Sequence, residues 1–190
     1  MGESEENSLY FTEKMNSSSV KPPRTLYQVW KGLPEGTLCQ VINNSLVISP
    51  LPLDIHQVVL NKINFSISTL LRKQPVGEVR IAPYDVHFSR QNIFQPDLIF
   101  LANEHLKLVK ARGLFGAPDL VVEVLSPGTA SKDSGEKKAV YEQYGVKELF
   151  IVEPESKLVK AFLLQNNQYN HPVITTGFFK SYLLKNTIRF

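Results

Sequence analysis

Three polar residues occur where the sequence otherwise predicts burial. Glu123 lies inside the otherwise apolar run 120–125, Asp97 precedes the apolar run 98–101, and Lys137 falls on the apolar side of a predicted helix. A buried unpaired carboxylate is costly, so it normally takes up a proton or finds a cation or hydrogen-bond donors. Each residue alone has a structural explanation: Glu123 can face solvent or pair with an arginine, Asp97 can serve a turn, and Lys137 can reach out to water.

One arrangement accounts for all three residues together. Two carboxylates about 4 Å apart repel by roughly 4 kcal/mol at an effective dielectric near 20, so they are tolerated chiefly when a divalent cation lies between them. Mg²⁺ takes oxygen ligands and keeps waters for a phosphate and for a nucleophile, and Mn²⁺ can substitute for it. A nearby ammonium stabilises the charge of the pentavalent phosphate or orients the attacking water. We therefore predict Asp97 and Glu123 as metal ligands and all three residues, with Lys137, as catalytic groups in phosphodiester hydrolysis.

The two carboxylates are predicted to lie on strands. Both alternating faces of residues 119–125 are largely apolar, which predicts a central strand with Asp119 and Glu123 on the same face. Residues 78–88 are predicted to form one long strand that pairs as an antiparallel hairpin with a second strand, residues 95–101. Asp97 would then lie near the entry of the strand that precedes the central one in the sequence.

The lysine is predicted to lie on a helix that begins at Asp133 and ends at Gly145. Lys137, Val140, Tyr141 and Tyr144 recur at positions i, i+3, i+4 and i+7, and therefore share one face of this helix. This face is otherwise apolar, so Lys137 should be directed toward the core.

Other patterns complete the expected fold. They predict a short helix at 26–30, two strands within 38–48 that turn at Asn43 and Asn44, and helical residues 103–112. A longer helix is predicted from an Asp54 cap to about residue 73, with a buried stripe of Ile55, Val59, Ile63, Ile67 and Leu70. Further strands are predicted at 148–152, at 157–164 and near the C-terminus. This order predicts an α/β architecture (α+β), with a mixed sheet flanked by helices on both faces.

Length and composition indicate a single globular domain. The chain has 190 residues, of which 43% are hydrophobic and 21% charged, so residues 24–190 are expected to form one domain and the polar residues 1–23 a flexible segment. No run approaches the roughly 18–20 apolar residues of a membrane span, and the first residues are acidic, unlike a secretory signal. We therefore expect a cytoplasmic protein without membrane association. The single cysteine, Cys39, excludes an intrachain disulfide and a cysteine-rich zinc site.

The motifs around these residues resemble a known group of nucleases. Pro96-Asp97 and Glu123 resemble the first two motifs of the PD-(D/E)XK restriction-endonuclease-like superfamily. A closer resemblance, over about residues 26–182, is to a large bacterial family of restriction-endonuclease-like proteins of unknown function, with blocks similar to QPDLIF, GAPDLVVEVLSPGT and DSGEKKAVYEQYGVKELFIVEP. It implies a restriction-endonuclease-like core, an endonuclease activity, a nucleic-acid substrate, expected to be DNA, and a homodimer.

One departure from the superfamily concerns the lysine. The usual lysine two places after the glutamate is absent, because residue 125 is Leu. The family that the other motifs resemble places its lysine on the following helix, which corresponds to Lys137. That is the residue already singled out by helical periodicity.

Further residues could support the site. The resemblance places the helix that begins near His56 beside the site, so His56 could contact phosphate or metal, although a packing role is also open. Asp119 is about 13 Å along the strand from Glu123, so it is expected to be a strand-entry or second-shell residue. Tyr141 could contact substrate or the ligands, and Ser126 could shape the adjoining loop.

Two other functions remain open. The chain could be a non-cleaving nucleic-acid-binding or partner-interaction module on the same fold, which its net charge of +3 also permits. Alternatively, the carboxylates could be the acid and base of a glycosidase, about 5–9.5 Å apart in a cleft that needs no metal. The sequence shows no aromatic platform for a sugar, so this hypothesis ranks last.

Overall fold

The structure is a computed structural model that describes residues 24–34, 36–126 and 133–190. The predicted flexible segment, residues 1–23, lies outside the described residues, and a single domain over 24–190 stays a prediction. None of the helices formed by the described residues is both long and apolar enough to span a lipid bilayer.

A sheet of seven strands forms the centre of the fold. Its strands are β3 (Gly77–Ile81), β6 (Leu98–Ala102), β9 (Leu120–Val124), β10 (Glu148–Val152), β11 (Leu158–Gln165), β12 (Gln168–Tyr169) and β13 (Val173–Thr176). The order is β12-β11-β10-β9-β6-β3, and β13 pairs with β11. Strand β9 runs antiparallel to β6 and parallel to β10, and all its residues are buried. The predicted mixed sheet with a central strand is confirmed.

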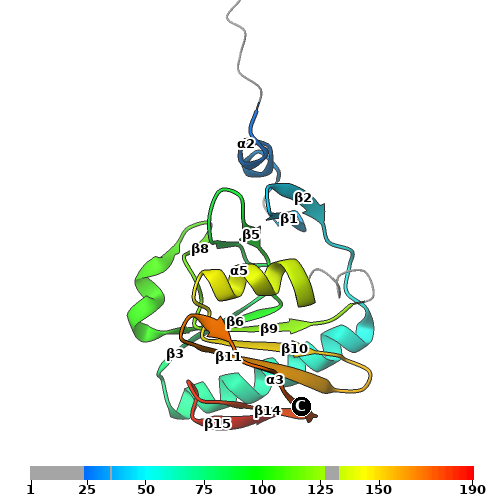
Figure 1. Cartoon of the computed structure of the whole chain (residues 1–190), viewed down its shortest axis with the longest axis vertical. Coiled ribbons are helices and arrows are strands. Elements are labelled where there is room, and N and C mark those ends of the chain that lie inside the picture. Colours follow the sequence, from blue (N-terminus) through cyan, green and yellow to red (C-terminus); the bar gives the residue numbers. More distant parts are fainter. Residues whose placement is uncertain (1–23, 35, 127–132) are drawn as a thin grey trace, which may run out of the picture.

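Helices cover both faces of this sheet (Figure 1). Helix α3 (Asp54–Lys73) lies on one face, and α5 (Lys138–Gln143), which follows a π-helical turn at Asp133–Lys137, lies on the other. Val122 belongs to the core cluster that includes the buried residues of α3, whereas Val121 belongs to the cluster that includes those of α5. Alternation along β9 therefore supplies two hydrophobic cores, one on each side.

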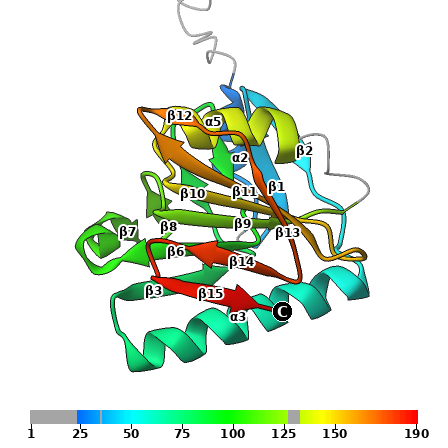
Figure 2. The same ribbon diagram turned by 60° about the horizontal axis from the view of Figure 1, so that its bottom comes forward.

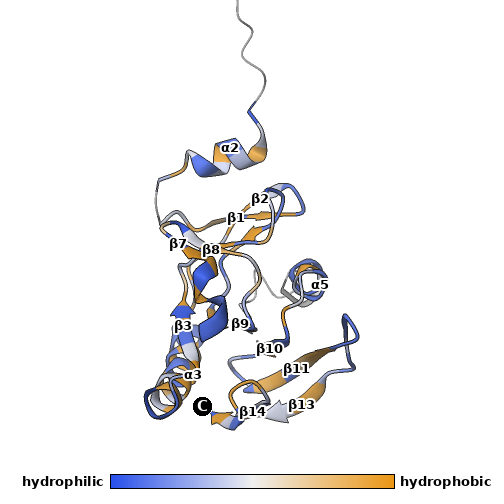
Figure 3. Cartoon of the chain, turned by 90° about the vertical axis from the view of Figure 1, so that its left-hand side faces the viewer, coloured by the Kyte–Doolittle hydropathy of each residue, from blue (hydrophilic) through white to orange (hydrophobic). Residues whose placement is uncertain are grey.

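The C-terminal strands close the α3 side. Strands β14 (Phe178–Ser181) and β15 (Asn186–Arg189) form an antiparallel pair, and β15 lies beside α3 (Figure 2). On the opposite side, α5 carries both hydrophobic and hydrophilic residues around its ribbon (Figure 3). Its buried residues, Val140 and Tyr141, are on the face predicted from the spacing.

A second sheet extends the structure on the α5 side. Its strands are β1 (Cys39–Ile42), β2 (Ser45–Ile48), β4 (Val86–His87), β5 (Ile93–Phe94), β7 (Val109–Lys110) and β8 (Gly113–Phe115), in the order β2-β1-β5-β4-β8-β7. The predicted hairpin within 38–48 is confirmed, with a turn at Asn43 and Asn44 in the left-handed region. The predicted short helix is α2 (Leu26–Lys31), which packs Trp30 onto β1.

The prediction of one continuous strand over residues 78–88 is wrong. Strand β3 ends at Ile81 and pairs with β6, whereas β4 begins at Val86 and pairs with β5 in the other sheet. The chain passes between the sheets through a segment that contains Pro83, which has no N–H for a ladder hydrogen bond. Strand β3 keeps the predicted antiparallel partner, because β6 overlaps the predicted strand 95–101, whereas β4 pairs with β5, which lies before that predicted strand. The two halves belong to different sheets.

The helical predictions need three corrections. Asp54 is the first residue of α3 rather than its cap, and its side chain makes no capping hydrogen bond. Ile55 is 37% exposed, whereas His56 is buried, so the start of the buried stripe is one residue later than predicted. Residues 103–112 form a 3₁₀ turn, Asn103–Leu108, followed by β7, because the chain turns into the second sheet there.

Candidate active site

The strand register brings the two predicted carboxylates together. Strands β6 and β9 pair Leu98 with Val122, so the next position of the same register places Asp97 opposite Glu123. Side chains opposite one another on antiparallel strands have Cβ atoms about 4.5–5.5 Å apart. The backbone N–H of Val124 donates to Asp97 Oδ2 at 2.7 Å. The Asp97 carboxylate is therefore hydrogen-bonded to the backbone N–H of Val124, the residue that follows Glu123.

Glu123 is buried, and its carboxylate is engaged by the helical segment that follows. Lys137 Nζ lies 2.5 Å from Glu123 Oε1, and the Tyr141 hydroxyl donates a hydrogen bond to the same oxygen. The exposed fraction of the Lys137 and Glu123 side chains is 3% each. Lys137 and Tyr141 are four residues apart, so one helical face delivers both groups to the strand.

Helix α3 supplies the third side of the site. His56 lies in its first turn and is buried. His56 Nε2 is 3.2 Å from Asp97 Oδ2, the oxygen that also accepts from Val124. The other oxygen, Asp97 Oδ1, accepts no hydrogen bond from the residues that the structure describes.

One pocket of about 230 Å³ joins these side chains. Among its lining residues are the predicted catalytic residues Asp97, Glu123 and Lys137, together with His56 and Ser126. Tyr141 is fully buried and contacts the carboxylate of Glu123 from within the core. Residues predicted from separate motifs of the sequence therefore meet around a single cavity.

Three further polar residues of this pocket were not predicted. Gln40 Oε1 accepts from the backbone N–H of Gln95, and Gln40 Nε2 donates to Ser49 Oγ, both at 2.9 Å. All three residues line the pocket. Gln40 is buried inside a short apolar strand, so the signal that identified Glu123, a polar residue in an apolar run, could have identified Gln40 too.

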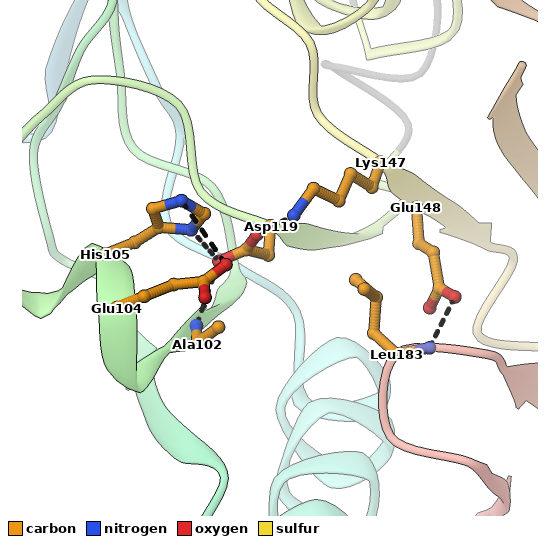
Figure 4. Close-up of polar contacts among 7 residues, drawn as sticks. All are labelled: Ala102, Glu104, His105, Asp119, Lys147, Glu148 and Leu183. Atoms are coloured by element: carbon orange, nitrogen blue, oxygen red, sulfur yellow. Dashed lines mark hydrogen bonds and ion pairs between the residues drawn. The ribbon is translucent and has the colours of Figure 1, made fainter.

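Asp119 belongs to a different cluster (Figure 4), because it directly precedes β9, whereas Glu123 is near the end of this strand. It accepts hydrogen bonds from the Ala102 backbone at 2.9 Å and from Lys147 Nζ at 2.7 Å, and its Oδ2 lies 2.7 Å from His105 Nδ1. Burial alone would raise the pKa of Asp119, but the hydrogen bonds from Lys147 and His105 hold that pKa below its ordinary value. Asp119 therefore joins β6, η1 (Asn103–Leu108) and the start of β10, and the structure does not bring it to the pocket.

Comparison with known proteins agrees with this arrangement. Residues 25–181 match the Uma2 family, whose description is "Putative restriction endonuclease". The chain belongs to this family. The resemblance read from the three sequence blocks is confirmed by this match.

A solved structure shows that the Uma2 chain has the restriction-endonuclease-like fold. The crystal structure of a putative nuclease belonging to DUF820 from Anabaena variabilis aligns with a TM-score of 0.71 and 16% sequence identity. The alignment covers 86% of this chain and 92% of the other. No curated protein matches the chain.

The donor groups of this Uma2 protein suit a hard divalent cation. Within residues 24–34, 36–126 and 133–190, no group of three or more His, Cys, Asp or Glu is arranged as a metal cluster. Mg²⁺ sites often use only one or two carboxylates together with water and phosphate, and Asp97 and Glu123 line one pocket. Asp97 Oδ1 also has no hydrogen bond from the described residues. These residues fit Mg²⁺ or Mn²⁺, whereas a structural zinc site would need four nitrogen or sulfur ligands.

Proposed function

We propose that this Uma2 protein is an endonuclease that hydrolyses phosphodiester bonds of DNA with Mg²⁺, for which Mn²⁺ can substitute. The observation that carries the proposal is the contact between Lys137 Nζ and Glu123 Oε1 in the pocket that Asp97 also lines. Two carboxylates and an ammonium in one cavity are the groups that metal-assisted phosphodiester hydrolysis uses. Membership of the Uma2 family supports a nuclease-like function.

The protein groups have separate roles in this proposal. Asp97 and Glu123 would hold the metal, which when bound polarises the phosphoryl oxygens and lowers the pKa of a coordinated water. Lys137 stabilises negative charge on the phosphate or orients the attacking water. His56 and the Val124 N–H hold Asp97 Oδ2, so the carboxylate keeps one orientation.

Cleavage of nucleic acids tests the proposal. Purified protein is incubated with supercoiled plasmid, linear duplex and single-stranded DNA, in Mg²⁺, in Mn²⁺ and in EDTA. We expect metal-dependent products from the wild type and from Lys160→Ala, which removes an exposed lysine on β11, but none from Glu123→Ala or Lys137→Ala. Equal product from wild type and both site variants would assign any cleavage to a contaminant and refute the proposal.

A non-cleaving binding module is the second candidate. It is favoured by the engagement of Glu123 Oε1 by both Lys137 and Tyr141, because these groups neutralise and satisfy the carboxylate without a metal. In that case DNA binding would weaken with rising salt, and no product would form under any metal condition. The predicted homodimer would suit either candidate function. Light scattering after size exclusion measures the molar mass in solution and so tests it.

A further inference from the structure

A second pocket adjoins the candidate active site. It has a volume of about 220 Å³, and its walls include Trp30, Pro34, Pro83, Asp85, Gln95 and Arg112. We call it the side pocket. Pro83 and Gln95 also line the pocket of Asp97 and Glu123, so the two pockets are adjacent.

The polar side of the side pocket includes the half-buried carboxylate of Asp85, the amide of Gln95 and Tyr84, whose hydroxyl is buried. Gln95 Nε2 donates to Thr37 O at 3.1 Å and to Asp85 Oδ1 at 2.9 Å, which fixes the orientation of this amide. Its oxygen, Gln95 Oε1, is buried and accepts no hydrogen bond from the described residues. Asp85 is half-buried, and its Oδ2 likewise accepts none from them. Gln95 Oε1 has almost no exposed surface, so the side-chain acceptor that a ligand can reach is the half-buried Asp85 carboxylate. A carboxylate oxygen without a donor favours a ligand with N–H groups.

The remaining walls combine flat apolar groups with one cation. Trp30 is held by a hydrogen bond from its Nε1 to Cys39 O at 2.9 Å, so its position is well defined. The turn before β8 brings Arg112 to the pocket, and Gly113 makes this turn possible, since a Cβ there would lie 2.2 Å from Asp85 O. The Arg112 side chain is exposed and makes no hydrogen bond with the described residues.

These features match an unpaired nucleobase. The volume is below the roughly 300–1,000 Å³ of pockets for drug-sized ligands, so one ring system fits better than a whole nucleotide. Nucleic-acid enzymes place an extruded or single-stranded base between apolar side chains and read its edge with hydrogen bonds. Arginine at the rim suits the adjacent phosphate, because its guanidinium binds phosphate oxygens in a bidentate manner.

We propose that the side pocket binds one unpaired guanine of the nucleic acid, beside the phosphate that reaches the Asp97–Glu123 pocket. This assignment rests on the proposed function. Guanine carries two adjacent donors, N1–H and the N2 amino group, which match the two oxygens of one carboxylate, that of Asp85. Thymine has a single N–H between two carbonyl oxygens, and these would face the Asp85 carboxylate unfavourably. Asp85 is thus the specificity-determining residue, and Gln95 Nε2 positions its carboxylate.

Trp30 provides a direct measurement, since it is the only tryptophan of the chain and lies in the wall of the side pocket. Its fluorescence is titrated in EDTA with the trinucleotides TGT, TAT, TCT and TTT of deoxyribose, and with TGT carrying hypoxanthine in place of guanine. We expect TGT to change the fluorescence and to bind about tenfold or more tightly than TTT. Hypoxanthine lacks the N2 amino group and should lose most of this preference.

Two variants separate base reading from phosphate binding. Asp85→Asn keeps an acceptor for Gln95 Nε2 but removes the carboxylate, and should abolish the preference for TGT. Arg112→Gln should weaken all trinucleotides by a similar factor. Glu104→Gln removes one negative charge from an exposed side chain near Asp119 and should bind like the wild type. The hypoxanthine ligand needs no protein variant, so the test holds even if Asp85→Asn is poorly folded.

Equal affinity for TGT, its hypoxanthine analogue and TTT would overturn the assignment of guanine. The result is also independent of cleavage. A TGT preference without any DNA cleavage would keep the side pocket and reject the nuclease, whereas metal-dependent cleavage with equal trinucleotide affinities would keep the nuclease and reject the guanine pocket.

Discussion

The ammonium of Lys137 lies 2.5 Å from the carboxylate of Glu123, although one residue comes from a helical turn and the other from the central strand. Both side chains are almost fully buried. Loss of one partner from a buried pair costs more than the pair itself contributes, because the remaining charge is left without compensation. Substitution of Lys137 or Glu123 should therefore change both the free energy of unfolding and the binding of metal.

Lys137→Ala is expected to lower the free energy of unfolding by about 3–5 kcal/mol in the absence of metal, because the Glu123 carboxylate loses the Lys137 ammonium. Mg²⁺ should restore more stability to this variant than to the wild type, since a bound cation replaces the missing charge. Urea unfolding with and without Mg²⁺ measures both effects, with Lys160→Ala as the control for loss of an exposed lysine. No added stabilisation by Mg²⁺ in Lys137→Ala would argue against a metal beside Glu123.

Tyr141→Phe removes only the hydroxyl that donates to Glu123 and keeps the ring, which packs on Phe88 and Phe94. The unfolding free energy should fall by about 1–3 kcal/mol, as for other hydrogen bonds to charged groups. Affinity for Mg²⁺, measured by calorimetry, should fall by about 10-fold or more, because residues that orient a metal ligand raise the affinity of the site for the metal. Tyr144→Phe, on the same helix face, serves as the matched control. Unchanged Mg²⁺ affinity in Tyr141→Phe would limit the hydroxyl to a structural role.

Asp119→Asn tests the cluster at the other end of β9. Hydrogen bonds hold the folded-state pKa of Asp119 below its ordinary value of about 3.9, so its contribution to stability is present above that pH and is lost as the pH falls through the lower folded-state pKa. The variant should be about 1–3 kcal/mol less stable at neutral pH. The difference from wild type should shrink below about pH 4.

Urea unfolding at several pH values measures this dependence. Glu155→Gln, an exposed change in the turn after β10, should leave the pH profile unaltered. A constant difference between Asp119→Asn and wild type from neutral pH to pH 2 would show that ionisation of Asp119 does not contribute. Nuclease activity, if present, should persist in Asp119→Asn at temperatures where the variant is folded.

Gly113→Ala should be among the more damaging single changes outside the carboxylate pocket. Gly113 has φ of +116°, and a Cβ there would lie 2.2 Å from the Asp85 carbonyl oxygen. A non-glycine residue in such a conformation costs on the order of 1–3 kcal/mol, and the clash adds to this cost. Thermal unfolding measures the loss, and Gly135→Ala, where a Cβ meets nothing within 4 Å, is the control. Similar melting temperatures for both variants would contradict the tight approach at Gly113.

The charged residues of the site were predictable because charge in an apolar run is a strong local signal. Glu123 and Lys137 each interrupt such a pattern, and the structure places both in one buried pair. Gln40 and Gln95 were missed because a neutral amide, unlike a charged group, carries little cost when it is buried and hydrogen-bonded. Which of them face a pocket depends on the pairing of distant segments, which local patterns do not specify.

The fold shows the same limit at Pro83. Residues on both sides of it have strand composition, and the predicted antiparallel pairing is confirmed for β3 with β6. The partner of β4 is β5, outside the predicted strand 95–101. Local β-propensity does not state which sheet a strand joins, so the change of layer was not predicted. The first residue of the buried stripe on α3 was ambiguous for a related reason. Helical spacing of i, i+3, i+4 and i+7 allows either Ile55 or His56 to precede Val59 on the buried face.

The hydrogen bond from Val124 to Asp97 has a consequence for how the site tolerates sequence change. The donor is a peptide N–H, which every amino acid except proline provides. Replacement of the Val124 side chain by another apolar residue would leave the anchor of Asp97 in place, and replacement of Glu123 would not remove it either. The Asp97 carboxylate is therefore positioned by a main-chain group. Related chains can vary the neighbouring side chains and keep this carboxylate in place as long as the pairing of β6 with β9 is kept.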